Sequence, residues 1–179
     1  SLVGSEMCIR DSNYNGMKYL PECMASLCQG QENAPEYEVL IIDNGSADGS
    51  VEYLDSEWCR KKEAPAEEGG EPQVRLIALP ENTGFCHAVN LGIREARSSY
   101  VILLNNDTRV EAGFVKGLYD AIRKDEKIFS VSAKMLMWDK PELLDDAGDR
   151  YCVLGWAYSR GKGRPAVDYD KNVSIFSAC

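Results

Sequence analysis

The apolar positions of this chain fall into short unbroken runs that are separated by amphipathic stretches. The clearest run is Tyr100–Leu104, which is followed at once by Asn105, Asn106 and Asp107. An apolar run without alternation is typical of a strand buried on both faces, as in the parallel sheet of an α/β protein. Ligands of such folds bind outside the carboxyl ends of the strands. The pattern therefore predicts a buried strand with its polar end at a site, although these three polar residues would equally form a simple turn.

Further runs predict three more strands, and the amphipathic stretches between the runs predict helices. The expected strands are Tyr37–Ile42, Val74–Leu79 and Ile128–Met135. The expected helices are Met17–Leu27, Val51–Trp58, Phe85–Ala96 and Glu111–Lys124. Strands that alternate with helices through short loops indicate right-handed βαβ units, so the sequence predicts an α/β fold with a mostly parallel sheet.

Two segments depart from this alternation. Residues 60–72 are charged and rich in glycine, proline and glutamate, which predicts a solvated loop. From Trp138 onward, recurring glycines indicate hairpins and loops, so this portion is expected to be looser and partly antiparallel. The last residues, Ser174–Cys179, have the pattern of the beginning of a strand.

Composition and charge exclude several classes of protein. The 179 residues carry a formal charge of −9, which argues against a nucleic-acid partner. The sequence contains no apolar run of the roughly 20 residues that span a bilayer, and no signal-peptide pattern. The seven cysteines form no C-x-x-C pair and there is one histidine, so a structural zinc site is not expected. Scattered cysteines fit a reducing compartment, which favours a cytoplasmic location.

Common phosphate, calcium and hydrolase motifs are absent from the sequence. It has no G-x-G-x-x-G run, no P-loop and no nucleophile elbow. An EF-hand beginning at Asp43 fails because Asp48 stands where that loop requires glycine. What remains is an acidic, amide-lined crevice, which suits a hard divalent cation such as Mg²⁺ or Mn²⁺ held by one carboxylate and substrate phosphates.

Four motifs, in this order, resemble those of the family 2 glycosyltransferases, which have the Rossmann-like GT-A fold. They are Asn13–Gly16, Val39–Ser50, Asn82–Gly92 and Leu103–Thr108. The resemblance extends over roughly residues 13 to 179. The Asp-Asn-Gly-Ser sequence at residues 43–46 and the Leu-Asn-Asn-Asp sequence at residues 104–107 resemble the rhamnosyltransferase-like branch in particular.

The resemblance implies an activity and its partners. It implies transfer of a hexosyl group from a nucleotide-diphosphate donor, such as a UDP- or dTDP-sugar, to an acceptor hydroxyl. The transfer would be inverting and assisted by Mg²⁺ or Mn²⁺. The acceptor would be a glycan or lipid-linked glycan in cell-wall or polysaccharide biosynthesis, which leaves peripheral membrane association open.

The resemblance also implies roles for individual residues. Asp43 and Asn44 would contact the base, and Asn82, Thr83 and Gly84 would lie near the ribose and the donor. Asn105, Asn106 and Asp107 stand at the family's D-x-D position, with Asp107 as the metal ligand. The expected donor-binding set is Asn15, Asp43, Asn44, Asn82, Thr83, Gly84, Asn90, Asn105 and Asn106.

Two departures from the family pattern shape the predicted domain organisation. Residues 1–12 contain several residues that are poor in a strand buried on both faces, so this segment is expected to be foreign and to supply no strand. The expected divisions are 1–12, a nucleotide-sugar-binding region at 13–137, and the start of an acceptor-side region at 138–179. The catalytic base is expected beyond Cys179, so the chain is interpreted as the donor-binding part of a truncated enzyme.

Two other functions stay open. One is a nucleotide- or metal-binding module without transfer activity. The other is a sugar nucleotidyltransferase, although its glycine-rich basic loop is longer than the Asn15–Lys18 segment. Donor binding without turnover would favour the first alternative.

Overall fold

The computed structural model describes residues 6–28, 30–59 and 72–170. The chain divides into two compact units, Ser1–Tyr119 and Asp120–Cys179. This division lies earlier in the chain than the predicted boundary between residues 137 and 138. The predicted loop at 60–72, apart from Pro72, and the predicted strand at Ser174–Cys179 lie outside the described residues.

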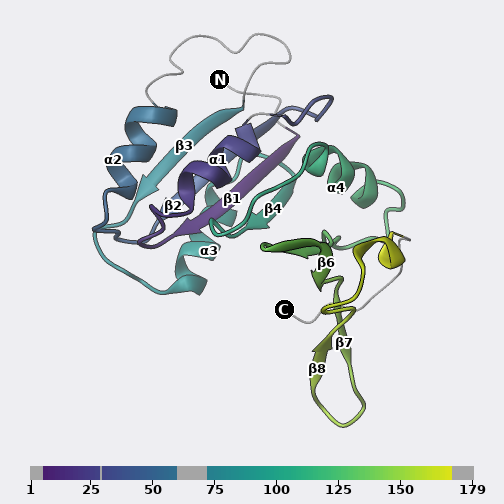
Figure 1. Ribbon diagram of the computed structural model, residues 1–179. Helices are drawn as coiled ribbons and strands as arrows, with labels where there is room; N and C mark the ends of the chain where they lie inside the picture. The colour runs from purple at the N-terminus through teal and green to yellow at the C-terminus, as the bar shows by residue number, and fades with distance from the viewer. Residues whose placement is uncertain (1–5, 29, 60–71, 171–179) are drawn as a thin grey trace. The chain divides into compact units, whose positions relative to one another are not determined.

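A four-stranded parallel sheet forms the centre of the first unit (Figure 1). Its strands are β1 (Met7–Asn13), β2 (Tyr37–Asp43), β3 (Gln73–Ala78) and β4 (Tyr100–Leu104). They lie in the order β3-β2-β1-β4, and every neighbouring pair is parallel. The predicted α/β fold with a mostly parallel sheet is therefore confirmed.

The expectation that residues 1–12 supply no strand is wrong. Strand β1 lies in the middle of the sheet, between β2 and β4. Met7, Cys8 and Ile9 are buried and supply its apolar half. The strand needs no further apolar residues because its carboxyl end, at Asn13, is buried by polar contacts instead. The hypothesis that residues 1–12 are foreign or mis-translated also rested on the motif match that begins sharply at Asn13, so it stays a prediction.

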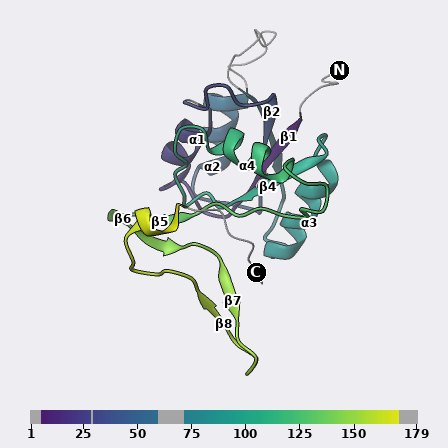
Figure 2. The same ribbon diagram turned by 90° about the vertical axis from the view of Figure 1, so that its right-hand side faces the viewer.

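Helices cover both faces of this sheet (Figures 1 and 2). The helices are α1 (Leu20–Cys28), α2 (Ser50–Leu54) with the π-helical turn η1 (Asp55–Cys59), α3 (Phe85–Glu95) and α4 (Phe114–Ile122). The larger core joins one face of the sheet to α1, α2 and α4, through side chains such as Ile9, Ile41, Leu20, Leu54 and Val115. A smaller core on the other face joins Cys8, Leu40 and Ile42 to Ala88 of α3. The amphipathic stretches thus lie where the sequence predicted.

Strands β2 and β4 differ in burial, although their sequence patterns are alike. Every residue of β2 from Glu38 to Asp43 is buried, as the apolar run predicted. In β4 only Ile102 is buried, and Leu103 is 57% exposed. The prediction that Tyr100–Leu104 is buried on both faces is therefore wrong for the part of the chain described. The reason is its position, because β4 is the edge strand of this sheet.

The second unit contains short antiparallel sheets. Strand β5 (Met135–Met137) pairs with β6 (Lys140–Asp146), and β7 (Asp149–Tyr151) pairs with β8 (Ala157–Ser159). A short 3₁₀ helix, η3, follows at Ala166–Tyr169. The prediction of a looser, partly antiparallel portion after Trp138 is confirmed.

The prediction of a strand at Ile128–Met135 is wrong. Residues 128–134 have no regular secondary structure, and strand pairing starts only at Met135. Ile128, Phe129 and Val131 have the right composition for a strand, but strand formation also requires a partner ladder. Ladder hydrogen bonds in this unit begin with β5 and are antiparallel.

Two further observations concern the whole described part of the chain. None of its helices is both long enough and apolar enough to cross a membrane. Six cysteines of the described residues are free thiols: Cys8, Cys23, Cys28, Cys59, Cys86 and Cys152.

Candidate functional site

The carboxyl ends of the parallel strands bring polar side chains together. The register places Asn13 of β1 beside Asp43 of β2, and Asp43 beside Ala78 of β3. Strand β4 runs parallel to β1 on the side opposite β2. Asn105 and Asn106, which follow β4, therefore lie at the same carboxyl ends of the strands. This edge is where ligands of open α/β sheets bind.

A buried polar pair joins the first two strand ends. The side-chain amide Nδ2 of Asn13 donates to Asp43 Oδ2 at 2.6 Å and to Ser46 Oγ at 3.1 Å. The backbone N–H of Ser46 donates to Asp43 Oδ1 at 2.8 Å. Asn13 and Asp43 are both fully buried. Each carboxylate oxygen of Asp43 therefore has a donor, as a buried charge requires.

The end of β4 is connected to the same pair. Asn106 Nδ2 donates to Asn13 Oδ1, so Asn13 links Asn106 to Asp43. Gly16 lies against this contact, since a Cβ atom at this position would overlap both Asn106 Nδ2 and Asn13 Oδ1. The glycine of the Asn13–Gly16 motif is therefore required by close packing against side chains of the site.

A second network fixes the loop that follows β3. Asn44 Oδ1 accepts hydrogen bonds from Thr83 N at 2.9 Å and from Thr83 Oγ1 at 3.0 Å. Asn44 Nδ2 donates to Asn82 Oδ1 at 3.0 Å, and the same oxygen accepts from Gly84 N at 2.9 Å. Asn44 is 3% exposed, whereas Asn82, Thr83 and Gly84 are exposed. One buried amide thus shapes an exposed loop.

Gly45 allows this loop to approach β2. Its φ angle is +79°, which favours glycine, and a Cβ atom would lie 2.6 Å from the backbone carbonyl carbon of Glu81 and 2.8 Å from Asn82 N. Both the left-handed backbone and the lack of a side chain are therefore needed at this position.

A third set of contacts ties the loop after β1 to the loop after β2. Asn15 N donates to Ser46 Oγ at 2.8 Å, and Ala47 N donates to Asn15 Oδ1 at 2.9 Å. The carboxylate of Asp48 accepts hydrogen bonds from Met17 N at 2.9 Å, from Ser50 N at 3.1 Å and from the Ser50 hydroxyl. The small burial of this carboxylate raises its pKa, but these hydrogen bonds to the charged form outweigh it and lower the pKa below 3.8.

Three predicted site residues lie on the surface and take no part in these networks. Asn105 and Asp107 follow β4 and are exposed, as is Asn90 on α3. None of the three contributes a side chain to the hydrogen bonds described above. The structure therefore brings together Asn15, Asp43, Asn44, Asn82, Thr83, Gly84 and Asn106, and leaves the other three at the surface.

Asp107 could hold a divalent cation only if the phosphates of a bound substrate supplied further metal ligands. Among the residues that the structure describes, no three or more His, Cys, Asp and Glu side chains come together as a metal site. Mg²⁺ and Mn²⁺ are commonly held by one or two carboxylates plus substrate phosphates and water. An exposed carboxylate at the carboxyl end of β4 fits that second arrangement.

The sequence interpretation missed three residues of the networks. Asn13, Ser46 and Asp48 stand in the motifs, but they were not assigned to the site. Ser46 and Asp48 could have been predicted from their position, since they closely follow Asp43-Asn44-Gly45 in the same motif. The role of Asn13 could not be read without the register of β1, because that strand was not expected.

Comparisons with known proteins identify the family of this chain. Residues 12–161 match the family described as glycosyl transferase family 2, and the chain belongs to that family. The chain is 25% identical to glycosyltransferase GlyG of Streptococcus pneumoniae serotype 4, over 91% of this chain and 51% of GlyG. It is 30% identical to chondroitin synthase of Escherichia coli, over 63% of this chain and 14% of that protein. The chain therefore spans about half the length of GlyG and less of the synthase.

Solved structures show the same fold. A crystal structure of S. aureus TarS in complex with UDP-GlcNAc has a TM-score of 0.55 and 19% identity, over 73% of this chain and 38% of TarS. The mannosyltransferase PcManGT from Pyrobaculum calidifontis, in complex with GDP-Man and Mn²⁺, has a TM-score of 0.51 and 19% identity, over 63% of this chain and 30% of that one. The predicted GT-A fold is confirmed.

Proposed function

We propose that this chain binds a nucleoside-diphosphate sugar and serves a glycosyltransferase that transfers the sugar to an acceptor hydroxyl with inversion. The observation that carries this proposal is the hydrogen-bond network at the strand ends. It holds two loops of exposed amide and hydroxyl groups, around Asn15 and around Asn82–Gly84, beside the exposed Asp107. The bound UDP-GlcNAc and GDP-Man in structures of the same fold support this class of donor.

Buried and exposed residues would have different roles in donor binding. Asp43 is fully buried with both oxygens hydrogen-bonded, so it would shape the base site by holding Asn13 and Ser46. Asn44 would act in the same way on the loop after β3. The exposed polar groups and the half-buried Asn106 would then contact the base, ribose and sugar. The exposed residues are Asn15, Asn82, Thr83, Gly84, Asn90 and Asn105.

Asp107 would hold Mg²⁺ or Mn²⁺ together with the donor phosphates. Its carboxylate is exposed at the carboxyl end of β4, the edge where Asn106 also lies. When bound, the cation offsets the negative charge that grows on the leaving diphosphate. The Mn²⁺ in the PcManGT structure supports a divalent cation in this fold.

The acceptor would be a glycan or a lipid-linked glycan. Relatives named for such polymers support it, including chondroitin synthase and the poly-β-1,6-N-acetyl-D-glucosamine synthase of Staphylococcus epidermidis. The donor would be a UDP- or dTDP-hexose, and the rhamnosyltransferase-like motifs at residues 43–46 and 104–107 are the reason to test dTDP beside UDP.

Calorimetric titration of UDP and dTDP, with and without Mn²⁺, tests donor binding directly. We expect metal-dependent binding by the chain and its loss in Asp107→Ala. Asp139→Ala is the matched control, because Asp139 is also an exposed carboxylate but lies in the turn between β5 and β6. Equal binding by both variants would contradict the role of Asp107, and no nucleotide binding by the folded chain would contradict the function.

A turnover assay distinguishes glycosyl transfer from donor binding alone. The chain is incubated with a UDP- or dTDP-sugar, Mn²⁺ and a glycan acceptor, and the acceptor-dependent release of free UDP or dTDP is followed. Metal-dependent release that is lost in Asp107→Ala supports a transferase. Tight binding without release would favour the alternative of a nucleotide-binding module.

A further inference from the structure

A β-hairpin projects from the second unit and ends in a turn of unusual composition (Figures 1 and 2). Strands β7 and β8 pair in regular antiparallel register, with Arg150 opposite Tyr158. The turn Cys152–Gly155 is closed by a hydrogen bond from Gly155 N to Cys152 O at 2.9 Å. Val153 and Leu154 therefore occupy its two central positions, where surface turns usually carry Gly, Asn, Asp, Ser or Pro.

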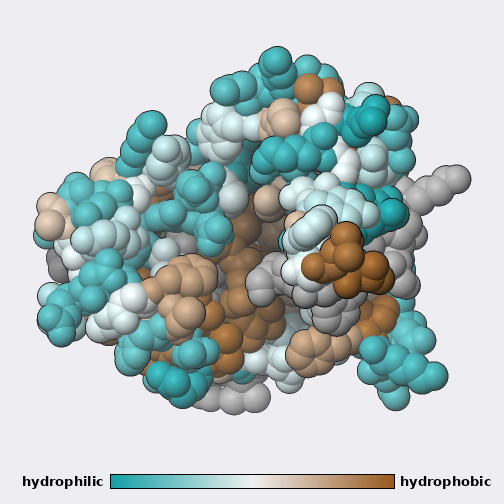
Figure 3. All heavy atoms as spheres, turned by 90° about the horizontal axis from the view of Figure 1, so that it is seen from below, coloured by the Kyte–Doolittle hydropathy of each residue, from teal (hydrophilic) through white to brown (hydrophobic). Residues whose placement is uncertain are grey.

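The end of the hairpin is apolar and open to solvent. Val153 is 100% exposed and Leu154 is 72% exposed. The sequence from Tyr151 to Ser159 contains no charged residue. Figure 3 views the molecule from below, and strongly hydrophobic side chains gather at the end of the hairpin that faces the viewer. Exposed apolar side chains that lie together favour contact with a partner or a membrane.

One face of the hairpin changes steadily in polarity from its end to its base. Side chains two residues apart point to the same face of a strand, so Trp156, Tyr158 and Arg160 share a face with Arg150. Trp156 is 60% exposed and Tyr158 is 51% exposed. Along this face the order is apolar at the turn, then Trp, then Tyr with Arg, and then Arg.

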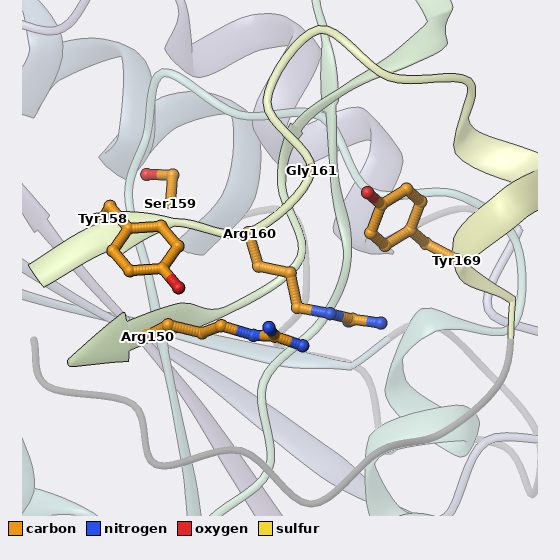
Figure 4. A pocket seen from close by; sticks show the side chains of 6 residues that line it. All are labelled: Arg150, Tyr158, Ser159, Arg160, Gly161 and Tyr169. Atoms are coloured by element: carbon orange, nitrogen blue, oxygen red, sulfur yellow. The ribbon is translucent and has the colours of Figure 1, made fainter. Parts of the chain in front are cut away.

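The two arginines line a hollow at the base of this face (Figure 4). The hollow has a volume of about 370 Å³ and is lined by Arg150, Tyr158, Ser159, Arg160, Gly161 and Tyr169. Arg160 is fixed there, because its guanidinium lies 4.8 Å from the Tyr169 ring centroid and donates from Nη1 to Ala147 O at 3.2 Å. None of the lining residues is acidic, and among the described residues neither arginine forms an ion pair.

We propose that this hairpin docks on the surface of a bilayer that contains anionic phospholipids. Val153 and Leu154 would enter the acyl boundary, and Trp156 and Tyr158 would lie at the level of the headgroups, where these two residue types are enriched. Arg150 and Arg160 would bind lipid phosphates, which match the planar guanidinium. The benefit of docking, access to a lipid-linked acceptor, rests on the proposed function; the docking itself does not.

The layering of residue types favours a bilayer over a protein partner. A bilayer requires apolar, aromatic and cationic groups at successive depths along one projecting element, which is the order observed here. A stable protein interface buries about 800 Å² on each partner, far more than the end of one hairpin offers. A second copy of this chain is therefore the alternative that the experiment must separate.

Co-sedimentation of the 179-residue chain with vesicles tests the proposal. One set of vesicles is phosphatidylcholine alone, and the other contains about one third phosphatidylglycerol. We expect the chain to bind the anionic vesicles, with affinity that falls at high salt because the arginine contacts are screened. The double variant Val153→Ser, Leu154→Ser should bind at least about tenfold more weakly, since it removes the apolar groups that enter the bilayer.

Matched variants separate each part of the surface. Arg150→Gln should reduce the preference for anionic vesicles, whereas Arg164→Gln should not, because Arg164 is an exposed arginine outside the hollow.

Val167→Ser is the control for the apolar changes, because Val167 is 74% exposed on η3. In Trp156→Phe, the blue shift of tryptophan fluorescence on adding anionic vesicles should disappear, although Trp58 and Trp138 are retained.

Several outcomes would overturn the proposal. The proposal fails if the chain does not bind anionic vesicles, or if the double variant binds them as tightly as the wild type. It also fails if millimolar glycerol phosphate releases the bound chain, because that result would indicate a site for soluble phosphate. Self-association that the double variant abolishes, without vesicle binding, would identify a second copy of the chain as the occupant. UDP titration of the same variants keeps the two proposals apart, because hairpin variants should bind nucleotide normally and Asp107→Ala should bind vesicles normally.

Discussion

The side-chain amide of Asn13 donates to the carboxylate of Asp43 at 2.6 Å, and both residues are fully buried. They are 30 residues apart in the sequence and lie side by side at the ends of β1 and β2. The backbone N–H of Asn44 also donates to Asn13 O at 2.8 Å. This buried amide–carboxylate pair thus joins the loops that follow β1 and β2, which would present polar groups to a donor.

Asn13→Ala should destabilise the fold. It removes the donor to Asp43 Oδ2 and the acceptor of Asn106 Nδ2, which leaves a buried charge incompletely hydrogen-bonded. Loss of a partner to a buried polar group costs about 1–3 kcal/mol, and more when the group is charged. Urea unfolding followed by circular dichroism should show this decrease in the free energy of unfolding.

Asn105→Ala is the control for that measurement. Asn105 is also an asparagine at a strand end, but its side chain is exposed. Its removal should change the free energy of unfolding by less than about 0.5 kcal/mol, as is usual for surface substitutions. Equal destabilisation by the two variants would show that the buried Asn13–Asp43 pair contributes no more to the free energy of unfolding than an exposed asparagine does.

Gly45→Ala should displace the loop after β3 and weaken donor binding. The added Cβ would lie 2.6 Å from the backbone of Glu81, and φ at this position is +79°. Gly49→Ala is matched in backbone strain, since φ at Gly49 is +88°, but its Cβ would meet nothing within 4 Å. Calorimetry with UDP and Mn²⁺ should show a loss of about tenfold or more in affinity for Gly45→Ala only, because a backbone clash cannot relax without moving the loop.

The sequence predicted the elements whose evidence is local. The apolar run of β2, the helical periodicity of α1 and the polar residues after β4 each lie in one short stretch, and all three were placed correctly. Long-range properties could not be predicted in this way. The burial of β4 depends on its edge position, and the central place of β1 depends on neighbours that cover a strand with polar residues.

For the candidate site, too, local features could be predicted from the sequence and long-range contacts could not. The motifs indicated which loops carry polar groups, but their hydrogen-bond partners depend on the sheet register. Asp43 was expected to contact a ligand, and its burial between Asn13 and Ser46 became visible only when β1 and β2 were paired. The exposed Val153 and Leu154 had a local signal, two apolar residues before Gly155, but their exposure depends on the turn geometry.

Asp48 should give the fold an acid-dependent contribution to stability. Hydrogen bonds from Ser50 and Met17 hold the pKa of this carboxyl below 3.8 in the folded chain, although its small burial acts in the opposite direction. A lowered folded-state pKa stabilises the fold above pH 3.8, and the contribution is lost as the pH falls through the folded-state pKa. The effect should be small, because the side chain is exposed.

Urea midpoints as a function of pH should detect this contribution. Wild type should exceed Asp48→Asn in stability at neutral pH, and the difference should shrink as the pH falls below 3.8. The side-chain carboxyl signal of Asp48, followed by NMR, should titrate with a midpoint below that value. A constant difference between the two proteins across the acid range would rule out the linkage.

Asn44→Ala should release the loop after β3 without unfolding the sheet. The substitution removes the acceptor for Thr83 N and Thr83 Oγ1 and the donor to Asn82 Oδ1. Thr83 is exposed, so its backbone N–H should exchange with solvent at least about tenfold faster once the hydrogen bond is lost. UDP affinity should fall in parallel, because ordering each loop residue on binding costs about 1–2 kcal/mol of backbone entropy.

Asn44→Asp separates the effect on the loop from the effect on the ligand. The carboxylate keeps an acceptor for Thr83, so protection of the Thr83 N–H should remain. It also places an oxygen against Asn82 Oδ1 in place of the N–H donor and adds a negative charge near the expected diphosphate. Nucleotide affinity should therefore fall with little change in hydrogen exchange. If Asn44→Ala left the exchange rate of Thr83 unchanged, the buried amide would not be what orders this loop.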